Sequence, residues 1–171
     1  MGKHSYFIII FVLFLFTSCG YKFTGSGDFP KGVNSIFMPI FENKTSETGV
    51  ETTLTNELII QIVKKGKVKV KDKKGDADAT IYGVVVTLKD NAVSSDETLT
   101  QSESKLTLYA NIKLKKSDGT ILLNLAGVNS SKNYTTYSSD KQTTLSNKAT
   151  AIEELSQNLA ETIYNRLTDD F

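Results

Sequence analysis

Side chains suited to catalysis or metal binding are scarce in this 171-residue chain. It has one histidine, His4, and one cysteine, Cys19. Between them runs an almost unbroken apolar stretch, residues 6–16, which would form only about 16 Å of helix against a hydrocarbon core of ~30 Å. A stretch of this length after a short basic start is typical of a signal peptide, so we expect residues 1–18 to be removed. The remaining chain, 19–171, then has no histidine, and its only thiol is at its first residue.

The absence of histidine, and of any thiol other than that of Cys19, limits the chemistry of the remaining chain. It excludes a Ser-His-Asp triad, a Cys-His pair and a zinc site with His or Cys ligands. Asp76 and Asp78 would share one face of an extended segment, where they could act as an acid–base pair or hold a hard metal ion, and they would also suit a simple turn before a strand. A periplasmic hydrolase using these carboxylates is therefore the lesser alternative. We expect no enzyme, no catalytic residue, no metal and no cofactor apart from a covalent lipid.

The position of Cys19 predicts lipid attachment. Cys19 follows the apolar stretch and two small residues, Thr17 and Ser18. This arrangement resembles the signal of bacterial lipoproteins, in which the cysteine is acylated and becomes the first residue of the mature chain. Several acyl chains, at ~0.8 kcal/mol per buried CH₂, would make the attachment effectively permanent. Gly20 follows the cysteine, and by lipoprotein sorting rules this implies transport to the outer membrane. The alternative to a cleaved and acylated chain is an uncleaved anchor with a buried Cys19.

Length and composition predict one domain over residues 31–171, joined to the lipid by a segment at 19–30. Hydrophobic residues make up 39% of the chain and charged residues 23%. Such a chain is too apolar to be disordered and too polar for many membrane spans. Its net charge of +1 gives no general support for nucleic-acid binding.

Periodicity predicts two helices and five strands. Apolar residues recur at helical spacing from 50 to 63, before a typical helix end at Lys64-Lys65-Gly66, and polar residues at 43–46 offer N-caps. The second helix should start at about Ser146. Strands are expected at 33–40, 67–71, 79–95, 106–114 and 121–137.

The order β-α-β-β-β-β-α predicts an α+β fold. It should be a two-layer sandwich, with both helices on one face of a mixed, mostly antiparallel sheet. The first two strands should be parallel and the later ones should form hairpins. The other sheet face, which would carry Tyr109 and Lys113, is expected to be free for water or a partner. The connections at 96–103 and 138–146 should lie at one end with the start of the first strand, and the turns at 73–78 and 117–120 at the other.

Several segments, taken in order, resemble the lipopolysaccharide-assembly lipoprotein family LptE. They are Cys19–Phe23, Gly32–Thr45, Glu51–Gly66, Ala77–Ala79 with Gly83, the segment around Tyr134, and the helix with Leu159-Ala160 and Ile163-Tyr164. The resemblance implies a periplasm-facing outer-membrane lipoprotein that plugs the β-barrel LptD and helps it to assemble. It also implies binding of lipopolysaccharide and no enzymatic activity.

Under this resemblance, lysines and strand tyrosines become candidate contacts. Lipopolysaccharide carries phosphates, which Lys binds as a mobile point charge. The candidates for lipopolysaccharide binding are Lys89, Lys132 and Lys141, and the candidates for partner contact are Tyr134 and Tyr137. The seven lysines between 64 and 74 are more simply a helix end and a solvated strand face. A lipoprotein adaptor of another envelope complex is the alternative function.

Overall fold

The computed structural model of this protein describes residues 27–93 and 101–168. The predicted signal peptide and Cys19 lie outside these residues. The strands are β1 (Ser35–Phe37), β2 (Glu42–Asn43), β3 (Lys69–Lys71), β4 (Ala79–Ala92), β5 (Gln101–Lys116) and β6 (Ile121–Tyr137); the helices are α2 (Val50–Lys65), α3 (Lys141–Thr168) and the short 3₁₀ helix η2 (Lys74–Asp76).

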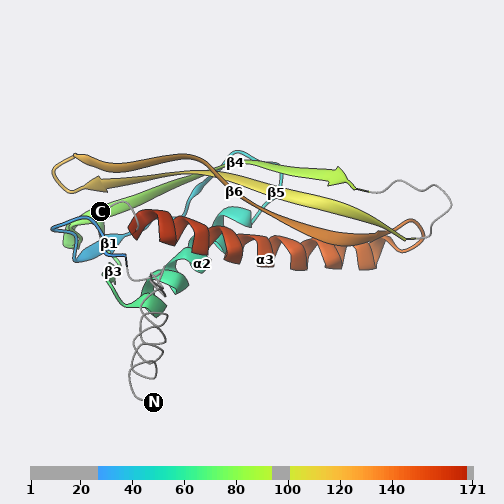
Figure 1. The fold of residues 1–171 in the computed structure, drawn as a ribbon, viewed down its shortest axis with the longest axis horizontal. Coiled ribbons are helices and arrows are strands. Elements are labelled where there is room, and N and C mark those ends of the chain that lie inside the picture. The colour runs from blue at the N-terminus through green and yellow to red at the C-terminus, as the bar shows by residue number, and fades with distance from the viewer. Residues whose placement is uncertain (1–26, 94–100, 169–171) are drawn as a thin grey trace, which may run out of the picture.

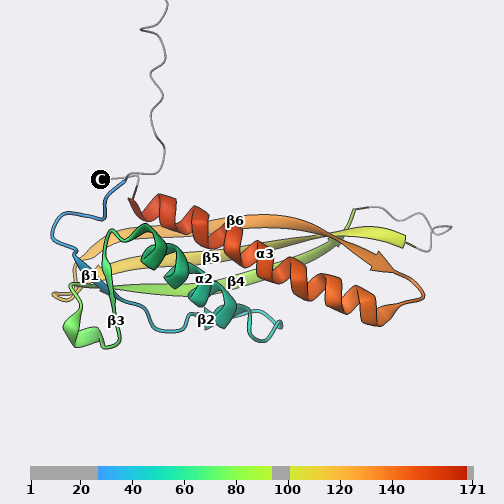
Figure 2. The same ribbon diagram turned by 90° about the horizontal axis from the view of Figure 1, so that it is seen from below.

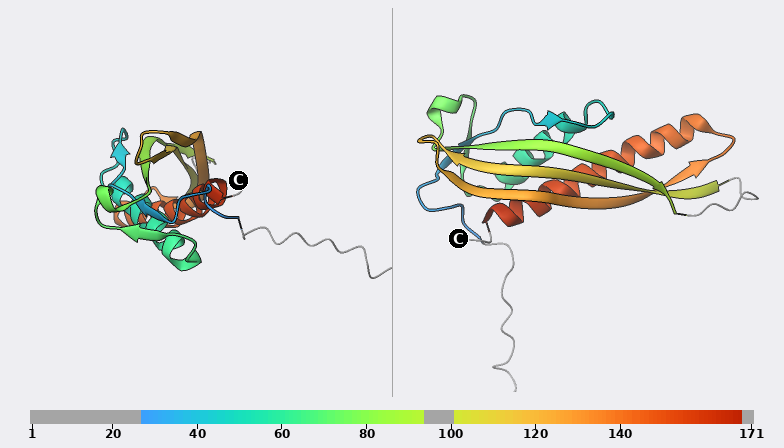
Figure 3. Two further views of the ribbon diagram at one scale, coloured as in Figure 1. Left: turned by 90° about the vertical axis from the view of Figure 1, so that its left-hand side faces the viewer. Right: turned by 90° about the horizontal axis from the view of Figure 1, so that it is seen from above.

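The elements form two layers, as predicted. The sheet order is β3-β1-β4-β5-β6, with β2 also beside β4. Long antiparallel pairings join β4 to β5 and β5 to β6, and these three strands run along the length of the molecule (Figure 3). Helices α2 and α3 lie together on one face of the sheet (Figures 1 and 2). The α+β sandwich with a mixed, mostly antiparallel sheet is confirmed.

The core lies between the helices and the inner face of the sheet. Every second residue of β5 from Leu106 to Leu114 is at most 1% exposed, as the alternation predicted. The helices contribute fully buried side chains at helical spacing: Leu54, Leu58 and Ile62 from α2, and Leu155, Leu159 and Ile163 from α3. Burying a side chain of this size contributes roughly 1.5–3 kcal/mol, so these stripes hold the two layers together.

The predicted hairpin between the strand at 67–71 and the strand at 79–95 is wrong. Instead β1 lies between β3 and β4 and is parallel to both. The connection at 72–78 reaches at most about 25 Å, and β3 is only three residues, about 10 Å, long. The connection is therefore long enough to return along β3 and to cross β1.

The predicted position of the start of the first strand is also wrong. Ile36 of β1 pairs with Ala79, so β1 starts at the end with the turns at 73–78 and 117–120, not at the other end. These two turns do lie together, as predicted, because Ser117 N donates to the Asp78 carbonyl oxygen (3.0 Å). At the far end, Gln101 pairs with Tyr137, which places the start of β5 close to the start of α3.

Helix α3 begins at Lys141, earlier than the predicted Ser146. Asp140 is the N-cap: its Oδ1 accepts a hydrogen bond from Thr143 N (2.9 Å), and its Oδ2 accepts one from Thr143 Oγ1 (2.6 Å). The first turns carry few apolar residues, so hydrophobic periodicity could not detect them. Lys141, expected in a loop, is the first residue of the helix.

Helix α2 is not capped by the polar residues at 43–46, contrary to the prediction. Asn43 Oδ1 accepts from Thr45 N (2.8 Å), so these side chains close a local turn. The N-cap is Gly49, with φ 93°. The Glu51 carboxylate reaches back to accept hydrogen bonds from Gly49 N (3.1 Å) and Asn43 Nδ2 (2.7 Å).

The two ends of the described chain lie side by side. A Cβ atom at Gly27 would be 2.3 Å from the carbonyl oxygen of Thr168, so only glycine fits against the end of α3. The chain therefore enters the fold where α3 ends, close to the β5–β6 turn and far from the start of α3 (Figure 1).

Candidate functional site

The sheet face that points away from the helices, here called the open face, has two adjacent hollows. The first, of about 480 Å³, is lined chiefly by Tyr82, Val84, Asn111, Lys113, Lys115 and Asn124. The second, of about 240 Å³, is lined by Val86, Thr87, Lys89, Tyr109, Asn111 and Gly127. Asn111 of β5 borders both, so the hollows form a continuous strip across β4, β5 and β6.

Irregularities in β4 and β6, the strands on either side of β5, shape this strip. The β4–β5 register shifts between Val85 and Thr87, and the β5–β6 register shifts between Ala110 and Ile112. Such bulges increase the twist of a sheet and redirect side chains. Gly127 has φ 65° at the second bulge, and its N–H donates to Asn111 Oδ1 (2.8 Å). This bond fixes the Asn111 side chain between the two hollows.

Lysine ammonium groups lie over tyrosine rings at both ends of the strip. Lys89 Nζ is 5.3 Å from the ring centroid of Tyr109, and Lys74 Nζ is 5.8 Å from that of Tyr82. Both distances fall within the range of cation–π attraction. A hydrogen bond from Lys74 is the main reason why the pKa of Tyr82 is lowered. The open face is therefore cationic, with aromatic rings beneath two of its charges.

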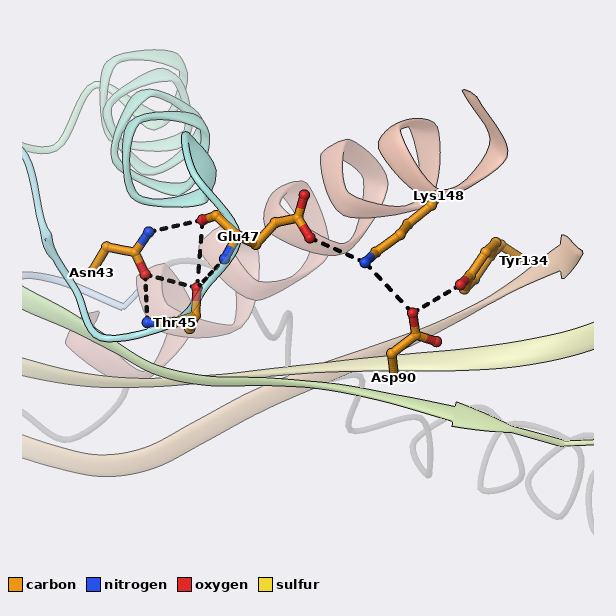
Figure 4. A network of polar contacts seen from close by, with 6 residues as sticks. All are labelled: Asn43, Thr45, Glu47, Asp90, Tyr134 and Lys148. Atoms are coloured by element: carbon orange, nitrogen blue, oxygen red, sulfur yellow. Dashed lines mark hydrogen bonds and ion pairs between the residues drawn. The ribbon is translucent and has the colours of Figure 1, made fainter. Parts of the chain in front are cut away.

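A polar network joins the elements on the helix side, at the far end of the sheet (Figure 4). Lys148 Nζ of α3 lies 3.1 Å from Glu47 Oε2 and 3.6 Å from Asp90 Oδ2. Tyr134 donates its hydroxyl hydrogen to the same Asp90 oxygen (2.9 Å). Burial raises the pKa of Tyr134, and so does this hydrogen bond. Burial alone would lower the pKa of Lys148, but Glu47 and Asp90 outweigh it, so the ammonium is held charged.

The structure does not bring the predicted contact residues together. Lys89 is exposed on the open face, whereas Lys132 forms an ion pair with Glu154 of α3 on the helix side. Lys141 is exposed at the start of α3. Tyr134 belongs to the polar network, and Tyr137 N donates to Thr144 Oγ1 (2.8 Å). The predicted roles of these residues stay predictions.

Of the residues that line the strip, only Lys89 was among the predicted contact residues. The alternation along β5 placed Tyr109 and Lys113 on the outer face, and the same alternation extends to Asn111 and Lys115. It could not show that bulges in β4 and β6 would hollow the face around Asn111.

The carboxylates considered for hydrolysis have different surroundings. Asp78 Oδ2 accepts hydrogen bonds from Asn34 N, Ser35 N and Ser35 Oγ, each 2.9 Å long. These bonds, with that from Asn34 N foremost, lower the pKa of Asp78. Asp78 thus holds the start of β1, while Asp76 is exposed at the end of η2.

Within residues 27–93 and 101–168, no three His, Cys, Asp or Glu side chains are grouped as metal ligands would be. Over the same residues, neither helix is sufficiently long and apolar to cross a membrane.

The fold and the strip define a class of protein: an α+β domain whose open sheet face carries a hollowed strip lined by lysines. A family model described as lipopolysaccharide-assembly, LptE, matches residues 33–167, so the chain belongs to the LptE family. No curated protein matches the sequence.

Solved structures of bacterial lipoproteins have a similar fold, among them two named lipoprotein B. Rare lipoprotein B from Shewanella oneidensis is 11% identical, with a TM-score of 0.51 over 78% of this chain and 93% of that one. Lipoprotein B from Nitrosomonas europaea is 13% identical, with a TM-score of 0.50 over 82% of this chain and 84% of that one. At these identities the likeness concerns the fold alone.

Proposed function

We propose that this chain is an outer-membrane lipoprotein of the lipopolysaccharide translocon. In this role it plugs an LptD-type β-barrel, assists the assembly of that barrel, and binds lipopolysaccharide for delivery to the outer leaflet. Lipid on Cys19 anchors it facing the periplasm. The protein has a binding and scaffolding function and catalyses no reaction. The observation that carries the proposal is the family match over residues 33–167.

The described surface supports a binding role. The open face presents lysines, amides and tyrosine rings rather than a paired acid and base. Of the three lysines proposed for lipopolysaccharide, Lys89 and Lys141 are exposed, whereas Lys132 would have to leave Glu154 to reach a phosphate. Lys89 and Lys141 are therefore the better placed candidates.

The test is to isolate the C-terminally tagged chain from its own membranes in mild detergent and to identify everything retained by mass spectrometry. We expect a stoichiometric β-barrel of LptD type, lipopolysaccharide, and an acylated Cys19. An acylated chain with a different envelope partner, or with none, would contradict the translocon assignment and favour the adaptor alternative. An untagged strain processed in parallel controls for proteins that bind the resin.

A further inference from the structure

We propose that the open face binds the phosphorylated saccharide portion of its ligand, along the strip centred on Asn111. This inference rests on the proposed function and names the part of lipopolysaccharide that this surface would hold. Neither the polar network around Lys148 nor the helices take part in it.

The charge of the strip favours an anion. Lys89, Lys113 and Lys115 are exposed lining residues, and the two hollows have no carboxylate among their lining residues. Lysines without local counter-charges attract phosphate, which an ammonium binds from many directions. Because the lysines lie in both hollows, the strip suits a ligand with more than one phosphate.

The remaining groups match a sugar. The Asn111 side chain is exposed and accepts the hydrogen bond from Gly127 N through Oδ1, and its Nδ2 takes no part in this bond. An amide nitrogen has two donors, and Asn124 and Thr87 add further polar groups that can meet hydroxyls. The Tyr82 and Tyr109 rings offer flat faces beside these polar groups.

Two other occupants fit less well. Protein interfaces depend on large apolar anchors in their centres, and acyl chains need apolar depth. None of the large hydrophobic side chains that are exposed in the described residues lines either hollow; these are Ile40, Ile60, Val63, Val93, Ile121 and Leu145. The apolar lining consists of the Tyr82 and Tyr109 rings and of short aliphatic groups, Val84, Val86 and Ala126, with Ile112 buried beneath them. The chemistry therefore points to the headgroup rather than to the acyl chains or a protein.

The experiment measures calorimetric binding by the full acylated chain in detergent. The probes are a glucosamine disaccharide with a phosphate at each end, the same disaccharide without phosphates, phosphatidylglycerol micelles, and intact lipopolysaccharide. The open-face variant is Lys89→Gln with Lys113→Gln and Lys115→Gln. The control variant, Lys31→Gln with Lys64→Gln and Lys69→Gln, removes the same charge at exposed lysines that line neither hollow.

We expect the open-face variant to bind the phosphorylated disaccharide about tenfold or more weakly, and the control variant to stay within about twofold of the unaltered chain. Circular dichroism should show both variants folded. Equal binding by the two variants would overturn the inference. So would equal affinity of the unaltered chain for the phosphate-free disaccharide, or equal dependence of phosphatidylglycerol binding on the open-face lysines.

Intact lipopolysaccharide separates the two proposals. If the unaltered chain does not bind it, the proposed function is contradicted. If the unaltered chain and the open-face variant bind it equally well, the function stands and only the assignment to the open face is overturned.

Discussion

Gly83 makes room for a neighbouring aromatic ring. It lies in β4, where a Cβ atom would be 2.4 Å from Cγ of Phe41, a residue only 3% exposed. The need for glycine is therefore steric, and the ring fills the space between β1 and β2 beside β4.

We predict that Gly83→Ala lowers the free energy of unfolding by about 1–3 kcal/mol, because the buried ring must move. Urea denaturation of the purified chain measures this. Gly75→Ala is the matched control, since nothing lies within 4 Å of a Cβ there. If the two variants are equally stable, the steric explanation is wrong.

Asp140 makes the start of α3 sensitive to acid. The hydrogen bond from the Thr143 side chain, followed by that from the Thr143 backbone, lowers the pKa of Asp140 in the folded chain. A lowered pKa stabilises the fold above the ordinary carboxyl pKa, and the effect is lost as the pH falls through the folded value.

We predict that the amide of Thr143 is protected from hydrogen exchange at neutral pH and loses protection below about pH 4. Asp140→Asn, which keeps an N-cap acceptor but does not ionise, should remove this pH dependence. Protection factors measured by NMR across the range test it. A loss of protection that is the same in the variant would mean that another group titrates.

At the scale of single residues, sequence patterns predicted which side chains are buried or exposed better than they predicted which residues contact one another. The alternation correctly buried Leu106 and exposed Lys113. It could not show that Lys132 pairs with Glu154 or that Tyr134 donates to Asp90, because each contact joins elements that are distant in sequence.

Lys148 connects three elements at their junction. Its ammonium lies between Glu47, in the loop before α2, and Asp90 of β4. With Tyr134 of β6, these groups fix the first half of α3 to the far part of the sheet (Figure 4).

We predict that Lys148→Met lowers the free energy of unfolding by about 1 kcal/mol, because two carboxylates lose their shared cation. Lys64→Met, at an exposed position on α2, should change it by less than about 0.5 kcal/mol. Denaturant midpoints compare the variants. Combining Lys148→Met with Glu47→Gln should cost less than the sum of the single changes, and full additivity would count against a shared network.

At the scale of elements, the sequence sufficed for local structure but not for strand neighbours. The strand at 121–137 was correctly predicted as an extended segment, and the end of α2 was correctly predicted from its cations and glycine. Chain order suggested that β3 and β4 form a hairpin, yet three-residue strands carry too little pattern to specify pairing. Insertion of β1 between them depends on contacts such as those of Asp78, which no local pattern reveals.

For the whole molecule, the proposed lipid on Cys19 would determine where the domain works. We predict that Cys19→Ala leaves the fold intact but moves the chain from the membrane fraction to the soluble periplasmic fraction, since the acyl chains supply the membrane affinity. Cell fractionation and the intact mass of the purified chain measure this. Retention of the variant in the membrane fraction would show that another segment anchors the chain.

The contact between Gly27 and Thr168 also determines how far the domain can reach. From Cys19 to Gly27 the chain spans at most about 29 Å. The 17 residues of β6 extend about 56 Å further toward the end where α3 begins. A lipid at Cys19 would confine the whole domain to a hemisphere of roughly 85 Å radius, in which one molecule has an effective concentration on the order of 1 mM. A partner in the same patch of membrane would then be captured through contacts too weak to hold two freely diffusing proteins together.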